Sequence, residues 1–378
     1  MDYLLSIVVP TKDRYEYLEQ LVDLIISFKL PEIEMVIQDN TKENERILGF
    51  LESRDTTNIK YFHTAEQIPI SLNSDKAVLN SSGEYICFIG DDDGVTKYIL
   101  DGVRWMKNNG VEAAKPAEVY YIWPDASEAF RVKQAAVINY KKFTGKVKTL
   151  SSLNELLKVL KEGIPDRGNM PLAYHGIVSR RLMDRVYEKC GTYFPGNSPD
   201  IANAVALSLL DSKYVMVDLP WAIYGNCVLK GGGEGLPGRK FPPELTDIPW
   251  WAEGAEERWY KKLPKVAVGE TIWPDSAIYS LKQMGRGDLL SSFNLYKCYA
   301  RFLIAYPKLS HFIYDVCDNR SALRIAHFQL IVSKYIGAFL RRVKWMLGID
   351  KPLQELNIAN ISECVSKLES LTDGVIKY

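Results

Sequence analysis

The sequence predicts an α/β protein with a mostly parallel central sheet and helices on both faces. First, apolar β-branched runs alternate with segments of helical periodicity over the first 125 residues. Second, unbroken apolar runs such as residues 3–10 are typical of strands buried on both faces, as in parallel sheets. Third, the helices between the strands supply the crossovers that parallel pairing needs.

The expected elements follow in order along the chain. Periodicity predicts strands at 3–10, 34–39, 59–64, 84–90, 172–179 and 214–225, and helices at 15–28, 42–53, 75–82, about 97–108, 180–189 and 201–211. From about residue 275 onward the pattern is helical. We therefore expect a large first domain over 1–240, a linking segment over 241–275 and a helical region over 276–378.

Composition excludes several classes of protein. The 378 residues include 47 basic and 47 acidic side chains, so no net field favours nucleic acid. No apolar run reaches the length of a membrane-spanning helix, and the N-terminus lacks the features of a signal peptide. The six cysteines are scattered without a CxxC pair, which predicts free thiols in a reducing compartment, the cytoplasm.

An acidic cluster follows the fourth expected strand: Asp91, Asp92 and Asp93 come directly after the apolar run and Gly90. Parallel strands end at one edge of a sheet, where ligands bind, so Arg14 and Asp39 are expected nearby. A divalent cation such as Mg²⁺ or Mn²⁺, together with phosphate groups, would offset the repulsion between carboxylates. The alternative is a solvated acidic turn or a helix cap.

Other nucleotide and metal motifs are missing from the sequence. No GxGxxG follows the first strand, and no GxxxxGK[ST] occurs. The spacing of an EF-hand loop is also absent. The acidic cluster is therefore the main indication of function in the sequence.

Three motifs together resemble a known family: SIVVPTKDR, EMVIQDN and LNSDKAVLNSSGEYICFIGDDD. They are similar to the nucleotide-sugar half of family 2 glycosyltransferases, which have the GT-A fold. The resemblance covers residues 3–125 well and 170–235 loosely. It implies an inverting, metal-dependent transfer of a sugar from a nucleoside diphosphate sugar, usually a UDP sugar, with Mn²⁺ or Mg²⁺ as cofactor.

The resemblance also implies roles for single residues. Its donor-binding positions are Pro10, Thr11, Arg14, Asp39, Asn73, Lys76, Asp91 and Asp92. Asp39 would hydrogen-bond the base, Asp91 would face the ribose and Asp92 would ligate the metal. Gly90 stands where the family's DxD motif commonly has an Asp, so Asp93 remains an alternative metal ligand.

Inverting transfer needs one base that deprotonates the acceptor hydroxyl. The family carries this base in an acidic motif before a helix, and NSPDIANAVAL at 197–207 matches that setting, with Pro199 in place of the usual Glu. Asp200 is therefore the candidate base. The alternative is that Asp200 only caps its helix. His175 is a weaker candidate for the acceptor site, because a lone His beside a strand is more often structural.

Two further segments leave alternatives open. The Gly-rich loop at 230–243 is either a lid over the diphosphate or a plain surface loop. The basic, aromatic-rich helix expected over 322–349 either lies on the cytoplasmic face of the membrane, or packs on the catalytic domain or a second copy. The resemblance implies that the acceptor is a glycan or lipid-linked glycan of bacterial surface polysaccharide. A sugar-nucleotide nucleotidyltransferase and a non-catalytic sugar-binding protein are the alternatives.

Overall fold

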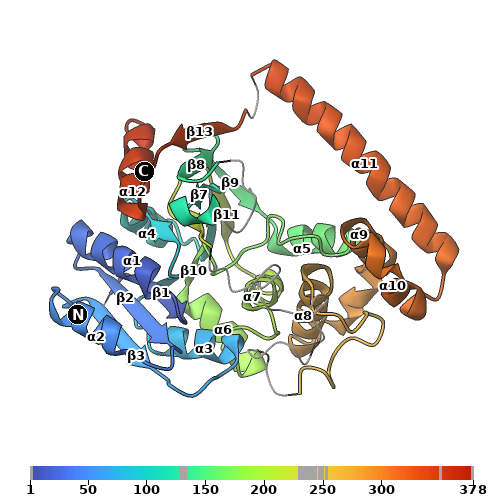
Figure 1. The fold of residues 1–378 in the computed structure, drawn as a ribbon, viewed down its shortest axis with the longest axis horizontal. Coiled ribbons are helices and arrows are strands. Elements are labelled where there is room, and N and C mark those ends of the chain that lie inside the picture. Colours follow the sequence, from blue (N-terminus) through green and yellow to red (C-terminus); the bar gives the residue numbers. More distant parts are fainter. Residues whose placement is uncertain are drawn as a thin grey trace.

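The computed structural model describes residues 3–127, 134–228, 245, 251, 254–348 and 351–375 (Figure 1). Within them, eight strands form the main sheet in the order β3-β2-β1-β4-β10-β6-β11-β9. Their bounds are Leu5–Thr11 (β1), Ile33–Asp39 (β2), Ile59–His63 (β3), Tyr85–Phe88 (β4), Ala113–Pro116 (β6), Val147–Leu150 (β9), Ile177–Ser179 (β10) and Tyr214–Val217 (β11). Strands β3, β2, β1 and β4 are parallel neighbours, so the predicted mostly parallel sheet is confirmed.

Helices cover both faces of this sheet. Those of the first part of the chain are Tyr15–Phe28 (α1), Glu45–Glu52 (α2), Ile70–Leu79 (α3), Ile99–Asn108 (α4), Ser152–Lys161 (α5), Arg180–Cys190 (α6) and Pro199–Ser208 (α7). Side chains alternate along β1: Ile7 and Val9 pack with α1 and α4, whereas Val8 packs with α3, α6 and α7. Burial on both faces is the reason that the strand reads as an unbroken apolar run.

Local chemistry sets several helix ends. The hydroxyl of Ser179 accepts the Leu182 amide and begins α6, and Gly191 ends it in the left-handed conformation, with φ 67°. Asn319 and Asn360 cap two later helices in the same way, each accepting an amide three residues on.

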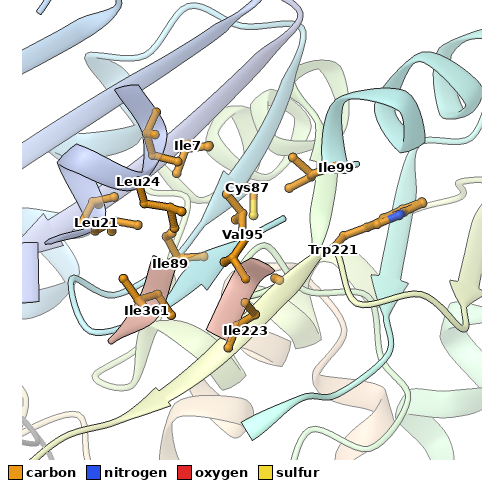
Figure 2. Close-up of a cluster of buried hydrophobic side chains, with 14 of the residues drawn as sticks. Ile7, Leu21, Leu24, Cys87, Ile89, Val95, Ile99, Trp221, Ile223 and Ile361 are labelled. Carbon is orange, nitrogen blue, oxygen red and sulfur yellow. The ribbon is translucent and has the colours of Figure 1, made fainter. Parts of the chain in front are cut away.

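A second sheet of five strands has the order β13-β8-β7-β12-β5. Its strands are Gly94–Val95 (β5), Tyr120–Ile122 (β7), Val137–Tyr140 (β8), Ala222–Asn226 (β12) and Leu353–Leu356 (β13). Thus β13, from the end of the chain, pairs antiparallel with β8. The last helix, Ile361–Thr372 (α12), packs against α1, and its Ile361 lies with Leu21 and Ile223 in the main core (Figure 2).

The remaining helices form a C-terminal helical region with its own core, as expected. They are Gly269–Gln283 (α8), Leu295–Ala305 (α9), Ser310–Val316 (α10) and Arg320–Met346 (α11). None of the helices among the described residues is both long and apolar enough to cross a membrane. The predicted division at residues 240 and 275 stays a prediction.

Four element predictions are wrong in their extent. The strand expected over 214–225 is two strands, β11 and β12, which lie in different sheets. Helix α3 begins at Ile70, not at residue 75. The strand expected over 172–179 is reduced to β10, since His175 has φ 62° and interrupts the extended backbone. Strand β13 lies inside the region predicted as helical, because its pairing partner is more than 200 residues away and leaves no local signal.

Candidate active site

The carboxyl ends of β1, β2 and β4 bring three predicted residues together. Thr11 is in register with Asp39 on the neighbouring strand β2. On its other side, the Thr11 hydroxyl donates a hydrogen bond of 2.5 Å to Oδ2 of Asp91, which follows β4. The convergence expected at this edge of the sheet is therefore present.

Arg14 lies between two of the aspartates. It precedes α1, and its Nη2 is 2.5 Å from Asp91 Oδ1 while its Nη1 is 3.4 Å from Asp92 Oδ1. Burial alone would lower the pKa of Arg14, but the two carboxylates raise it. Burial raises the pKa of Asp91 to about 7, with Arg14 opposing the rise and Asp92 adding to it. The guanidinium thus offsets much of the charge of this pair.

Asp93 has a separate set of partners. Its Oδ2 accepts the Gly90 amide at 2.6 Å and lies 2.7 Å from Nε2 of His175, and its Oδ1 accepts the Gly225 amide at 2.7 Å. Burial opposes ionisation, yet His175 and the two amides lower the pKa of Asp93. The side chain is fully buried, so Asp93 ties β4 to β10 and β12.

Asp92 lies between these two groups and is 5% exposed. Its backbone carbonyl accepts the indole N–H of Trp123 at 2.8 Å, and its Oδ2 lies 3.4 Å from the Cys227 amide nitrogen. No group of three or more His, Cys, Asp or Glu side chains in the described part of the chain has a geometry that would hold a metal ion. Mg²⁺ commonly takes one or two carboxylates plus phosphate oxygens. A metal held at Asp92 would therefore need most of its ligands from outside these residues, such as the oxygens of a diphosphate.

Asp39, the predicted base-binding residue, is fully buried. The hydroxyls of Tyr15 and Tyr61 donate to its Oδ2 at 2.6 and 2.7 Å, and the Thr41 amide donates to its Oδ1 at 2.8 Å. A carboxylate has about four acceptor positions, so three are taken by protein donors.

The other predicted donor-binding residues flank the same edge. Asn73 donates to the Gln38 carbonyl at 3.3 Å, and Lys76 donates to the Thr64 hydroxyl at 3.2 Å. Both therefore stand at the ends of β2 and β3, on the Asp39 side. Pro10 is half-buried beside them, in register with Gln38.

Asp200 stands in the first turn of α7, and its carboxylate is 20% exposed. The N-cap is Ser198, whose hydroxyl donates to Asp200 Oδ1 at 2.5 Å and caps no amide. Nη1 of Arg167 lies 3.6 Å from Asp200 Oδ2. Asp200 is thus held beside a cation at the positive end of a helix and is not itself the cap.

An aromatic group joins Asp200 to the aspartates, and we define it as Tyr174, His175 and Tyr224. The His175 ring centroid is 4.0 Å from that of Tyr174 and 3.7 Å from that of Tyr224. The Arg167 guanidinium lies 5.8 Å from both tyrosine rings. Asp93 contacts the His175 end of this group, and Asp200 contacts it through Arg167.

Sequence reasoning missed Arg167, Tyr174 and Tyr224, and it gave His175 only a weak role. Residues 230–243, predicted as a lid or a surface loop, lie outside the described residues. One signal was available: Gly225 stands inside an apolar strand, which often marks a close backbone approach. A Cβ at this position would overlap the Asp92 carbonyl.

The sequence was compared with those of known proteins. A family model described as glycosyl transferase family 2 matches residues 6–151, which include β1, β2, β4 and the aspartates. A search of curated proteins gives no match.

Solved structures show distant likeness only. Staphylococcus aureus TarS 1–349 in complex with UDP is 14% identical over 59% of this chain and 60% of that one, with a TM-score of 0.43. The same protein in complex with UDP-GlcNAc is 13% identical over 89% of this chain and 92% of that one, with a TM-score of 0.49. The mannosyltransferase PcManGT from Pyrobaculum calidifontis, in complex with GDP-Man and Mn²⁺, is 12% identical. The match covers 99% of this chain and 86% of that one, with a TM-score of 0.38.

This chain spans only about 60% of the first of these structures. Likeness at these identities and TM-scores says nothing of what this chain binds. The family match stands on the sequence of the N-terminal part, where the strand ends and the aspartates lie. Residues 6–151 of this chain thus match the model of glycosyl transferase family 2, the family that the sequence motifs resemble.

Proposed function

We propose that this protein is an inverting glycosyltransferase that moves a sugar from a nucleoside diphosphate sugar, most often a UDP sugar in this family, to an acceptor hydroxyl. The observation that carries the proposal is the convergence of Arg14, Asp91 and Asp92 at the carboxyl ends of β1 and β4. Asp200 lies across the aromatic group from them. One side thus offers charged groups for a diphosphate, and the other offers a single carboxylate.

On the donor side, Arg14 is a cation suited to phosphate oxygens. Asp92 would hold Mn²⁺ or Mg²⁺, which when bound offsets the charge that grows on a departing diphosphate. The three contacts of Asp93 favour Asp92 over Asp93 as that ligand. Asp91, held by Arg14 and Thr11, stands where the resemblance places a ribose contact.

On the acceptor side, Asp200 takes the proton of the attacking hydroxyl. The hydroxyl of Ser198 and the guanidinium of Arg167 orient its carboxylate. One such base is enough for inversion, since the hydroxyl attacks the sugar from the face opposite the diphosphate. The family resemblance alone supports a glycan or lipid-linked glycan of bacterial surface polysaccharide as the acceptor.

The test compares two variants of the candidate site. The full chain is incubated with UDP sugars and GDP-mannose, with and without Mn²⁺, and donor binding and slow nucleotide release are measured. Asp92→Asn should lose the Mn²⁺-dependent part of donor binding. Asp200→Asn should bind donor normally but release nucleotide roughly 10²–10⁴-fold more slowly, the usual contribution of a general base.

Asp211→Asn is the matched control, because Asp211 is exposed just beyond the other end of α7. It should behave as the parent chain. Full turnover by Asp200→Asn would show that another group is the base. Absence of metal-dependent binding for every nucleotide sugar would favour a non-catalytic protein.

A further inference from the structure

Within the described part of the chain, the buried apolar contacts of helix α11 lie near its beginning. Its buried side chains are Leu323, Ala326 and Leu330, all in its first half, where it packs along α9. No side chain from 331 to 346 is buried. Figure 1 shows α11 as a straight rod along the outer edge of the molecule.

The opposite side of α11 is apolar and faces solvent. Six of its large exposed residues are Ile325 (60%), Phe328 (69%), Tyr335 (72%), Ile336 (53%), Phe339 (67%) and Met346 (74%); Ile331, Leu340 and Trp345 are exposed as well. At 100° per residue these six side chains fall within an arc of about 100°, opposite the buried three. We call this set the apolar face of α11. Contiguous exposure of this kind marks an interaction site in most proteins.

The charge of α11 is of one sign. Its 27 residues contain six basic side chains and no Asp or Glu: Arg320, Arg324, Lys334, Arg341, Arg342 and Lys344. By the same rotation, all six lie outside the arc of the apolar face, at its margins or behind it. A long helix with an apolar face and a cationic remainder is typical of helices that lie on anionic membranes.

A second copy of the chain is a poorer partner for this face. Paired helices are usually aligned by opposite charges beside the apolar seam, and α11 has no acid to offer another α11. Anionic lipid headgroups supply the complementary charge. The helix is not apolar enough to cross a bilayer, so it would lie along the surface.

We propose that α11 docks on an anionic lipid surface, with the apolar face at the boundary between headgroups and acyl chains and with the Arg and Lys side chains on the headgroups. The proposal goes beyond sugar transfer and does not depend on the donor. It would hold the enzyme where lipid-borne acceptors lie.

The test is vesicle flotation of the full chain without nucleotide. The chain should bind vesicles of phosphatidylcholine mixed with phosphatidylglycerol, and not vesicles of phosphatidylcholine alone. High salt should weaken binding by screening. The triple variant Arg341→Gln/Arg342→Gln/Lys344→Gln should bind on the order of a hundredfold more weakly, at roughly fivefold for each charge.

The matched control removes three positive charges elsewhere: Lys141→Gln/Lys142→Gln/Lys148→Gln, all exposed. It should bind vesicles as the parent chain does. A second variant, Phe328→Gln/Phe339→Gln, should abolish vesicle binding while its melting temperature stays unchanged, because both side chains are exposed in the free protein.

Two results would overturn the proposal. One is equal binding of anionic vesicles by the two triple variants, which would show that the charges of α11 do not contribute to membrane binding. The other is a parent chain that is dimeric by sedimentation, ignores anionic vesicles and becomes monomeric with Phe328→Gln/Phe339→Gln. A second copy would then cover the face. Asp200→Asn should float like the parent chain, so failure of the sugar-transfer proposal is distinguishable from failure of this one.

Discussion

At the scale of residues, the three consecutive aspartates do not share one environment. Asp91 is paired with Arg14 and Thr11, and Asp93 with His175 and two backbone amides. Asp92 stands between them. The repulsion that the sequence suggests is therefore offset largely by protein groups.

The role of Asp93 can be tested by its effect on stability. Asp93→Asn puts an amide group where three donors now converge, and should lower the free energy of unfolding by about 2–4 kcal/mol. Urea denaturation measures the change. Asp211→Asn, at an exposed site, should stay within about 0.5 kcal/mol of the parent chain. If Asp93→Asn is as stable as the parent but loses metal-dependent donor binding, Asp93 is a metal ligand instead.

At the scale of elements, close packing of helix α4 on the loop before β12 depends on a glycine. A Cβ at Gly102 would overlap the ring of Trp221, which is 1% exposed. Figure 2 shows Trp221 at the edge of the main core, with Ile99 of α4 near it. Helix α4 therefore keeps a residue of poor helix propensity for a packing reason.

Two substitutions of helical glycines by alanine should change the free energy of unfolding in opposite directions. Gly102→Ala should lower the free energy of unfolding by about 1–3 kcal/mol, since overpacking exceeds the gain in helix propensity. Gly49→Ala in α2 meets nothing within 4 Å and should raise it by about 0.5–1 kcal/mol. Thermal and urea unfolding of both variants check the pair. A stabilised Gly102→Ala would mean that Trp221 can move.

At the scale of the whole molecule, residues 353–372 pack against elements from the first part of the chain. Strand β13 joins the second sheet, and the Tyr121 hydroxyl donates to the Ile358 carbonyl at 3.1 Å. Ile361 of α12 is fully buried and lies against Gly94, directly after the aspartates. The core around the first strands is therefore completed by residues far beyond them in the sequence.

This closure predicts a large effect for a residue near the end of the chain. Ile361→Ala should cost about 2–5 kcal/mol of the free energy of unfolding, because it leaves a cavity in the main core. Ile336→Ala, on the exposed side of α11, should change it by less than about 0.5 kcal/mol. A neutral Ile361→Ala in urea unfolding would mean that α12 does not contribute to the core.

Much of the fold and part of the candidate site could be predicted from the sequence. The alternation of strands and helices up to α4, and the meeting of Thr11, Asp39 and Asp91 at strand ends, follow from hydrophobic periodicity and from the geometry of parallel sheets. Both are local or regular patterns, and each is visible in a short window of the chain.

Only the tertiary structure decided which partner each aspartate has and which strand β13 pairs with. Gly225 reaches Asp93 across 132 residues, and β13 reaches β8 across more than 200. His175 meets Asp93 only because β10 runs antiparallel beside β4. Contacts of this kind depend on how distant segments pack, which no local pattern of residues records.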